Sequence, residues 1–559
     1  MVGKILSLFS KQIGGLHEAA FLLGLSAFAS QLLGLIRDRL LAGQFGAGEL
    51  LDVYYGAFRL PDLIYVSIAS FVSVTVLIPF ILEGLNRDDK AGVRKMLDQL
   101  FTLFTLVMIG VSVIAFFLLP FLVDYLAPGF SVEQQTLLVT LSRIMLLSPF
   151  LLGLSNLLGS VTQGLNKFFI YALSPICYNL GIIFGVIFFY PNFGLVGLAW
   201  GVVLGALGHL LVQWPALRQA GLSPHWRLPY DWKLIRRIIG ISLPRTITLG
   251  AHQFSLMMLI ALGSTLSVGA ITVFNFAWNL QSVPLAIVGV SYSVAAFPAL
   301  SRLFVEGDQA AFLNHIRTAF RHIVFWSVLA MVFFIVLRAQ VVRVILGAGN
   351  FGWTETRLVA AALALFAISV VAQGLVLLFV RGYYAAGRTL TPFLINTGSS
   401  LLIIVLAFNL KQLFLTWPVG RYFLESLLRV SDIEGTMVLI LPLAFSLGLI
   451  VNLLSLMILF TYDFGRLGRP VWRAGRQVVT AAIFGGFVSY QALNILARGF
   501  DLNTFSGIFL QGLGAGVIGL LSTFALLAIM DNKELGELSR TLRHKFWRST
   551  PIAPEPVEL

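Results

Sequence analysis

The side chains best placed to do chemistry in this chain are charges that follow a long apolar run. Arg37, Asp38 and Arg39 come directly after it, and Asp52 and Arg59 follow a short distance along the chain. Ionisable residues at membrane depth are costly, so they usually face a cavity or one another. A guanidinium group binds phosphate oxygens through paired N–H donors, which makes Arg37 a candidate phosphate ligand with Asp38 or Asp52 as its resting counter-charge. The alternative is that these side chains reach the membrane surface and only anchor the helix end.

No motif for another kind of chemistry is present. The sequence has no phosphate-binding loop, no His-Glu-x-x-His zinc motif and no Gly-x-Ser-x-Gly nucleophile motif. Its single cysteine, Cys177, excludes an intrachain disulfide and a cysteine metal cluster. We therefore expect a protein that is not an enzyme and has neither a cofactor nor a metal site. Transport by such a chain would be driven by a monovalent cation or by the membrane potential.

The composition identifies a membrane protein. Hydrophobic residues make up 58% of the chain and charged residues only 11%, whereas a soluble domain has about 25% charged residues. Many apolar runs reach about 20 residues, the length that crosses the hydrocarbon core of a bilayer as a helix. We predict an all-α polytopic membrane protein with fourteen transmembrane helices. The predicted spans are 19–36, 63–83, 99–123, 137–162, 171–190, 193–215, 240–262, 269–300, 322–342, 358–380, 391–410, 434–460, 475–497 and 505–530.

The net charge of +13 agrees with this topology. With the N-terminus in the cytoplasm, most Lys and Arg residues fall in the cytoplasmic loops, as the positive-inside rule requires. The basic segments at 218–237, 466–476 and 540–548 then face anionic lipid headgroups. We expect membrane lipid as a partner and no nucleic acid.

Two short sequence repeats indicate two matched halves. Leu173–Asn179 (LSPICYN) recurs as Leu390–Asn396 (LTPFLIN), and a weaker echo links 54–60 with 274–280. The copies lie six predicted spans apart, so the halves would be parallel repeats. That arrangement is typical of transporters, with the cargo site between the repeats.

These observations predict the following division of the chain. The parts are a cytoplasmic N-terminal segment at 1–18, an N-lobe of helices 1–6 at 19–215, a C-lobe at 216–410 that is completed by helix 12 at 434–460, a polar loop at 411–433, helices 13 and 14 at 475–530, and a cytoplasmic tail at 531–559.

The chain carries an ordered set of short motifs. They are Gly34-Leu-Ile-Arg-Asp38, Phe45-Gly-Ala-Gly48, Asp52, Ala57-Phe-Arg-Leu-Pro61 and Pro79, then Ala127-Pro-Gly-Phe130, Leu198-Ala-Trp200, 284–301 and Arg381-Gly-Tyr-Tyr-Ala385 before Thr391-Pro392. This set resembles that of the MurJ (MviN) lipid II flippase family, which shares a superfamily with multidrug (MATE) and polysaccharide exporters. The likeness spans most of the chain.

The resemblance implies a specific function. It implies two six-helix lobes around a cationic cavity, with the last two helices (475–530) forming a groove for a polyprenyl tail. The cargo would be lipid II, a polyprenyl-pyrophosphate-linked peptidoglycan precursor, carried from the cytoplasmic to the outer leaflet by alternating access. It also implies the bacterial cytoplasmic (inner) membrane, a role in cell-wall synthesis and cell shape, a monomer, and cell-wall synthesis proteins as partners.

Several residues depart from the family pattern. The family's cavity arginine before the Arg-Asp pair is Gln31 here, and its Asp-Arg pair in the eighth span is Trp278-Asn279. The predicted substrate-binding residues are therefore Arg37, Gln31, Asn279 and Arg381, and the charge partners or ion-coupling residues are Asp38, Asp52 and Arg59. Neutral amides suit sugar hydroxyls as well as phosphates, so export of another lipid-linked oligosaccharide or a small amphiphile is the alternative function. A membrane enzyme or a non-transporting scaffold is a third class.

Overall fold

A computed structural model describes residues 16–69, 77, 81, 89–165, 167–228 and 231–547 of the 559-residue chain. Every regular element in these ranges is a helix and none is a strand, which confirms the all-α prediction. Most of the predicted N-terminal segment, the end of the predicted tail and Pro79 lie outside these ranges.

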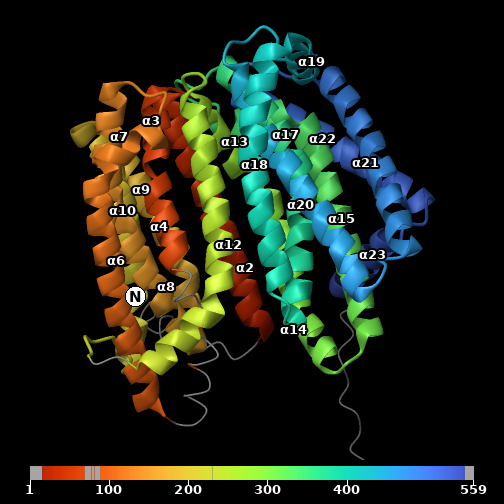
Figure 1. The fold of residues 1–559 in the computed structure, drawn as a ribbon. Coiled ribbons are helices and arrows are strands. Elements are labelled where there is room, and N and C mark those ends of the chain that lie inside the picture. Colours follow the sequence, from red (N-terminus) through yellow and green to blue (C-terminus); the bar gives the residue numbers. More distant parts are fainter. Residues whose placement is uncertain are drawn as a thin grey trace, which may run out of the picture. The chain divides into compact units, whose positions relative to one another are not determined.

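The chain divides into two compact units, whose helices are labelled in Figure 1. Unit 1 comprises residues 1–283, 345–366 and 388–452, and unit 2 comprises 284–344, 367–387 and 453–559. Two long helices, α17 (Trp353–Ala385) and α20 (Ile440–Phe464), contribute one part to each unit. The lobes at 19–215 and 216–410 stay a prediction.

Unit 1 holds most of the helices. They are α2 (Leu16–Phe45), α3 (Glu49–Ala57), α4 (Arg59–Ala69), α6 (Lys90–Leu126), α7 (Val132–Met145), α8 (Leu147–Gly164), α9 (Phe168–Phe184), a π-helical turn (Gly185–Phe189), α10 (Tyr190–Leu211), α11 (Trp214–Ala220), α12 (Trp232–Ser264), α13 (Ala270–Pro284), α18 (Leu390–Thr416), α19 (Pro418–Leu428) and a 3₁₀ turn (Thr436–Leu439). Unit 2 holds a π-helical turn (Leu285–Val290), α14 (Ser291–Val305), α15 (Gln309–Val336), most of α16 (Arg338–Leu346), α21 (Arg469–Leu496), α22 (Phe505–Ile529) and α23 (Lys533–Trp547).

Eleven stretches of the described chain are long and apolar enough to cross a membrane, so the protein is a multi-pass membrane protein. The predicted count of fourteen is not confirmed. One stretch, Phe168–Ala220, contains two predicted spans, and Gly194 divides it with a positive φ of 59° that breaks the helix. The span predicted at 63–83 includes residues outside the described ranges.

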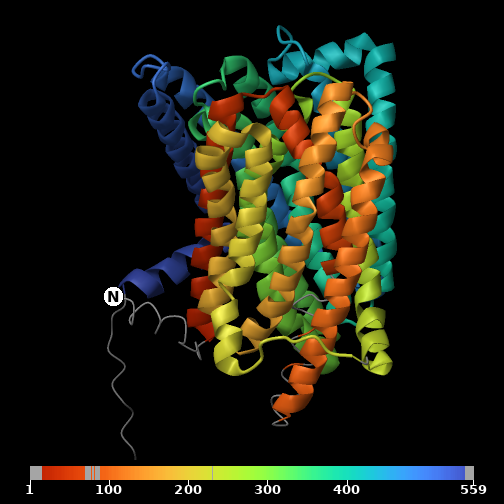
Figure 2. The ribbon, with the colours of Figure 1, turned by 90° about the vertical axis from the view of Figure 1, so that its left-hand side faces the viewer.

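Glycines bring α9 and α10 into close contact (Figure 2). A Cβ atom on Gly181 would lie 2.2 Å from the Cα of Gly205, and one on Gly185 would lie 2.6 Å from the Cα of Gly201. Helices packed in lipid approach closely through small residues of this kind. The close pair gives α9 a fixed position against which α2 packs.

An N-cap and an apolar core hold further helices of unit 1 in place. The Asp89 side chain accepts a 2.7 Å hydrogen bond from the Gly92 amide and starts α6, because an N-cap oxygen satisfies an otherwise unpaired helical N–H. A core of buried apolar side chains joins α4, α6 and α8. Helix α4 also packs on α12.

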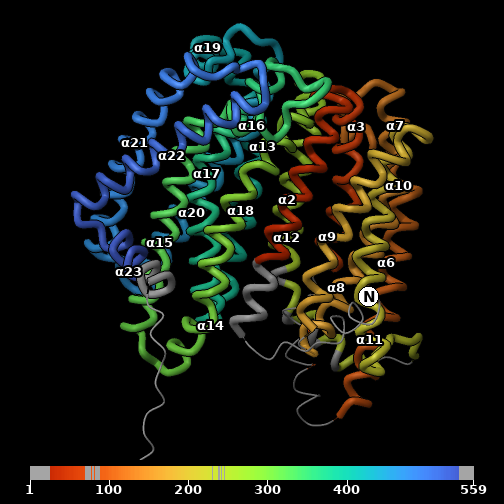
Figure 3. The backbone as a smooth tube through the Cα atoms, turned by 180° about the vertical axis from the view of Figure 1, so that it is seen from behind, coloured from red at the N-terminus to blue at the C-terminus, as the bar shows by residue number. Residues whose placement is uncertain are grey.

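Unit 2 contains a tightly packed helix pair, α21 and α22, which run side by side in Figure 3. A Cβ atom on Gly485 would lie 1.8 Å from Thr523 Oγ1, so the glycine is needed for this approach. Helix α21 packs on α15. Arg321 Nη1 of α15 lies 3.3 Å from Glu534 Oε1 of α23, which joins these two helices by an ion pair. Many outward side chains of the pair are apolar, such as Phe487 and Leu521, as expected of helices in contact with lipid.

The prediction of a polar loop at 411–433 is wrong. Helix α18 continues to Thr416, and after Trp417 the chain forms a second helix, α19. Arg421 and Glu425 gave the segment part of its polar character in the sequence, but both bond the buried Thr436 hydroxyl. Arg429 and Asp432 are exposed.

Candidate functional site

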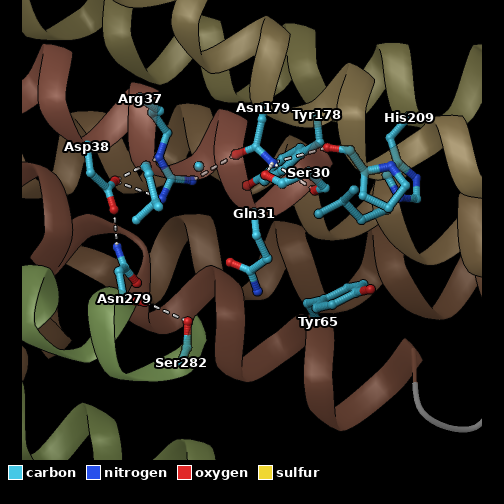
Figure 4. A pocket seen from close by; sticks show the side chains of 14 residues that line it. Ser30, Gln31, Arg37, Asp38, Tyr65, Tyr178, Asn179, His209, Asn279 and Ser282 are labelled. Atoms are coloured by element: carbon cyan, nitrogen blue, oxygen red, sulfur yellow. Dashed lines mark hydrogen bonds and ion pairs between the residues drawn. The ribbon is translucent and has the colours of Figure 1, made fainter. Parts of the chain in front are cut away.

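A polar pocket of about 380 Å³ lies within unit 1 (Figure 4). Five helices besides α2 contribute to its walls, namely α4, α8, α9, α10 and α13. The lining residues are Ser30, Gln31, Gly34, Leu35, Arg37, Asp38, Tyr65, Leu152, Pro175, Tyr178, Asn179, His209, Asn279 and Ser282.

Helix α2 supplies six of these residues because of their spacing. Ser30, Gly34, Arg37 and Asp38 are three or four residues apart, which places them on one face of a helix. Gln31 lies between the Arg37 cluster and Tyr65 in Figure 4. Its amide has no hydrogen-bond partner among the described residues, so both its donor and its acceptor are available to a ligand.

The Arg37 guanidinium is bound at one end of the pocket. Its Nε and Nη2 atoms donate to Asp38 Oδ1 at 3.0 and 2.8 Å, and Nη1 donates to Asn179 Oδ1 at 3.2 Å. Asp38, 2% exposed, accepts a 2.9 Å hydrogen bond from Asn279 Nδ2 through its other oxygen. Of the two counter-charges considered, the structure therefore pairs Arg37 with Asp38. The cluster joins α2, α9 and α13 and carries one positive and one negative charge.

Asn179 belongs to the repeated sequence motif and also ties α9 to α2. Its Nδ2 atom donates to Ser30 Oγ at 3.2 Å and to the Pro175 carbonyl at 3.2 Å. The second copy of the motif places Asn396 in α18, where its Oδ1 atom accepts a 2.9 Å bond from Asn452 Nδ2. Both copies thus use the asparagine to hold a neighbouring helix.

The far wall of the pocket is neutral and hydrogen-bonding. Asn156 Nδ2 donates to the Tyr65 hydroxyl at 2.7 Å. His209 Nδ1 lies 2.7 Å from Ser155 Oγ, which also accepts a 2.5 Å bond from Gln213 Nε2. These contacts hold the Tyr65 and His209 rings at the pocket. None of them involves an Asp, Glu, Lys or Arg side chain.

Asp52 lies elsewhere and holds a helix terminus. Its carboxylate accepts hydrogen bonds from the Gly269 amide at 2.7 Å, the Thr272 amide at 2.8 Å and Thr272 Oγ1 at 2.7 Å. These donors begin α13, and an anion stabilises a helix N-terminus. Among the described residues it bonds no basic group, so its contacts indicate a structural role that supports the helix carrying Asn279.

The two other predicted residues do not line this pocket. Arg59 donates through Nη2 to Asn275 Oδ1 on α13, and its buried Nε has no partner among the described residues. Arg381 belongs to unit 2. Of the predicted substrate-binding residues, Arg37, Gln31 and Asn279 line one pocket and Arg381 does not.

Sequence reasoning missed several pocket residues, among them Asn179, Ser282 and His209. Asn179 had a signal, since it ends the repeated motif, but the repeat was interpreted as topology alone. Ser282 lies three residues after Asn279, on the same helix face. His209 had no usable signal, because its position depends on how α10 packs on α8. Within the described residues, no three or more His, Cys, Asp or Glu side chains come together as a metal site would require.

Eleven apolar stretches able to cross a membrane and a polar pocket lined by six helices are features of a multi-pass membrane protein of the transporter class. The chain belongs to the lipid II flippase MurJ family, whose model matches residues 41–508. A relative described as a probable lipid II flippase MurJ from Rhizobium tropici is 24% identical over 541 residues, 93% of this chain and 96% of the relative.

Solved structures show the same fold. A lipid II flippase MurJ in an inward closed conformation is 21% identical, with a TM-score of 0.72 over 91% of this chain and 98% of that one. An inward-facing multidrug resistance transporter of the MATE family is 14% identical, with a TM-score of 0.62 over 81% of this chain and 95% of that one. Both likenesses concern the fold, and the transporter class follows from membership of the flippase family.

Proposed function

We propose that this protein translocates lipid II, the polyprenyl-pyrophosphate-linked precursor of peptidoglycan, and binds its headgroup in the pocket of unit 1. Membership of the MurJ family supports the cargo, and the observation that carries the site is the Arg37 guanidinium inside the pocket. Transport runs from the cytoplasmic to the outer leaflet of the bacterial inner membrane by alternating access. The N-terminus is cytoplasmic, and a monovalent cation or the membrane potential supplies the energy.

The pocket chemistry suits a headgroup that combines phosphate and sugar. Three N–H donors of Arg37 bond protein groups, and a guanidinium has five donors, so the remaining donors can meet a phosphate oxygen. Gln31, Asn279 and Tyr65 offer neutral donors and acceptors to hydroxyls. A volume of about 380 Å³ lies within the range of small-molecule sites, about 300–1,000 Å³, and holds part of such a headgroup.

The exposed apolar faces of α21 and α22 suit the polyprenyl tail. Residues such as Ile483, Phe487, Leu513 and Leu521 point outward from this helix pair. A polyprenyl chain that lies along these faces would be held by dispersion contacts, because in lipid apolar surfaces associate through packing.

Complementation tests the cargo. The gene is expressed in bacteria depleted of their own lipid II flippase, and growth is expected to be restored. Arg37→Ala is expected to abolish the restored growth. Arg302→Ala changes an exposed arginine of unit 2 and is expected to leave the restored growth unchanged. Failure of the unmodified protein to restore growth, despite its presence in the membrane, would reject lipid II as the cargo.

Export of another lipid-linked oligosaccharide is the second candidate. It is favoured by one observation, namely that Asp38 already neutralises Arg37 while most other polar groups of the lining are neutral. Binding of a pyrophosphate-linked lipid and of a monophosphate-linked glycolipid to the purified protein separates the two. Lipid II transport predicts tighter binding of the pyrophosphate lipid, and the second candidate predicts no preference for it.

A further inference from the structure

Helix α19 presents an apolar face away from the protein. Six exposed apolar or aromatic residues run from the last turn of α18 through α19. They are Leu415, Trp417, Val419, Tyr422, Phe423 and Leu427, which are 54–68% exposed. Soluble surfaces rarely expose apolar patches of this kind without a partner.

The charged residues of α19 are turned inward. Glu425, 4% exposed, accepts a 2.7 Å hydrogen bond from Arg421 Nε and a further bond from Thr436 Oγ1. Arg421 Nη2 donates to the same threonine oxygen at 3.2 Å. Because both Arg421 and Glu425 bond the Thr436 hydroxyl, which lies outside the helix, α19 cannot roll over to bury its apolar side without breaking these bonds.

The end of α19 is also fixed to unit 1. Arg357 of α17 donates to Asp432 Oδ2 at 2.8 Å and to Asp432 Oδ1 at 2.5 Å, and its Nη2 bonds the Arg429 carbonyl at 2.6 Å. Arg429 caps the helix in a left-handed conformation. The orientation of the apolar face is therefore set at both ends of the helix.

The position of α19 follows from the length of α18. Twenty-seven residues span about 40 Å at 1.5 Å per residue, which is close to the thickness of a bilayer with its headgroups, about 40–45 Å. Trp417 breaks the helix (φ −124°, ψ 79°), and Pro418 begins α19 immediately. Figures 1 and 2 show α19 crossing the end of α18 rather than continuing its axis.

The apolar face of α19 continues the outward stripe of α18. Along α18 the exposed apolar residues are Leu394, Leu401, Val405, Phe408 and Leu415, at the helical spacing of one face. Trp417 and Val419 extend this stripe onto α19. Exposed apolar side chains therefore run along α18 and resume on α19 after the break at Trp417.

We propose that α19 is an interfacial helix, buried by its apolar face in the headgroup and upper acyl region of the leaflet at the Thr416 end of α18. Its occupant is membrane lipid. Trp417 and Tyr422 supply the amphipathic rings that favour this depth, and Phe423 and Leu427 supply the apolar face of an in-plane helix. Arg421 and Glu425 cancel in formal charge and face inward, so binding depends on apolar area rather than on anionic lipid.

Site-specific fluorescence tests the proposal, since the chain has only one cysteine. In a Cys177→Ser background, Phe423→Cys carries an environment-sensitive label in phosphatidylcholine vesicles. Ser431→Cys, an exposed position in the polar segment after α19, is the matched control. The label at 423 is expected to emit at shorter wavelength, to be quenched severalfold more slowly by iodide, and to be quenched more by a nitroxide near the lipid headgroup than by one at the chain end. Adding phosphatidylglycerol or salt is expected to change none of these values.

Three results would overturn the proposal. Equal iodide quenching at both positions in vesicles would mean that α19 is in water. Shielding of position 423 in native membranes but not in pure-lipid vesicles would mean that a protein covers the helix. Burial that requires phosphatidylglycerol or disappears at high salt would mean that charge, and not apolar area, holds the helix at the membrane.

Discussion

At the scale of single residues, the central feature is that Arg37 and Asp38 are paired inside a pocket rather than exposed at a helix end. Removing one residue of a buried ion pair leaves the other charge uncompensated, which is strongly unfavourable. A simple loss of function after changing Arg37 would therefore have two explanations, loss of a ligand contact or loss of the counter-charge to Asp38.

A double-mutant cycle separates these explanations. Arg37→Ala is expected to weaken binding of a pyrophosphate lipid by about 1.5–3 kcal/mol, the value of a hydrogen bond to a charged group. Asp38→Asn in the same chain removes the unpaired charge and is expected to restore stability but not binding. Isothermal titration and thermal unfolding of the single and double variants provide the measurements. Recovery of full binding in the double variant would show that Arg37 only neutralises Asp38.

Asn279 offers a gain-of-function test, because the family pattern implies an arginine at this position. Asn279→Arg places a second cation where Asn279 now bonds Asp38, and it is expected to tighten binding of pyrophosphate lipid by about 1.5–3 kcal/mol. Asn279→Gln, which adds length but no charge, is the control. Unchanged affinity in the arginine variant, measured by the same titration, would contradict phosphate binding at this end of the pocket.

At the scale of helices, Asp52 has a structural task that differs from its predicted role as a charge partner. Asp52→Ala removes the acceptor of two buried backbone N–H groups at the start of α13. Each unsatisfied buried donor costs about 1–3 kcal/mol, so a clear loss of thermal stability is expected. Glu49→Ala is the control. It changes an exposed acid in the first turn of α3, the helix that also carries Asp52, and is expected to lower the free energy of unfolding by less than about 0.5 kcal/mol. Equal effects of the two changes would reject the proposed role of Asp52.

The contact between α21 and α22 gives a second prediction at this scale. Gly485→Ala forces a Cβ atom toward Thr523 Oγ1, at 1.8 Å in the present geometry, and overpacking of this kind costs about 1–3 kcal/mol. Gly475 lies in the same helix with no atom within 4 Å of a built Cβ, so Gly475→Ala is the matched control and is expected to be neutral or slightly stabilising. Thermal unfolding in detergent compares them. A stable Gly485→Ala protein would show that the two helices do not pack at this distance.

Helices were the part of the fold that sequence could predict well. Long apolar runs locate membrane helices because the bilayer requires about 20 apolar residues. The break at Gly194 falls just inside the span predicted at 193–215. Arg37 and Asp38 were found because charge beside an apolar run is conspicuous. Asn179 and His209 were not, because their place in the pocket depends on packing between helices distant in sequence. Helix α19 was missed because its charges suggested a solvated loop, whereas Arg421 and Glu425 bond each other and the buried Thr436 hydroxyl.

At the scale of the whole molecule, the family and the pocket differ in how much of the recognition they assign to phosphate. The chain belongs to the lipid II flippase MurJ family, yet Gln31 and Asn279 stand where the resemblance implies cavity arginines. A pocket with one paired cation and many neutral groups places more of the recognition on hydroxyls and less on phosphate. We therefore expect the protein to bind lipid II with a weaker dependence on salt than a site with several arginines would show.

Reorientation of lipid II in proteoliposomes tests the central claim most directly. Purified protein is reconstituted with labelled lipid II, and the fraction in the outer leaflet is followed over time with a membrane-impermeant reagent. The account predicts that the unmodified protein speeds exchange between leaflets, that the Arg37→Ala/Asp38→Asn variant loses this acceleration while remaining folded, and that Arg302→Ala keeps it. Exchange no faster than in protein-free vesicles, or equal acceleration by the folded double variant, would contradict it.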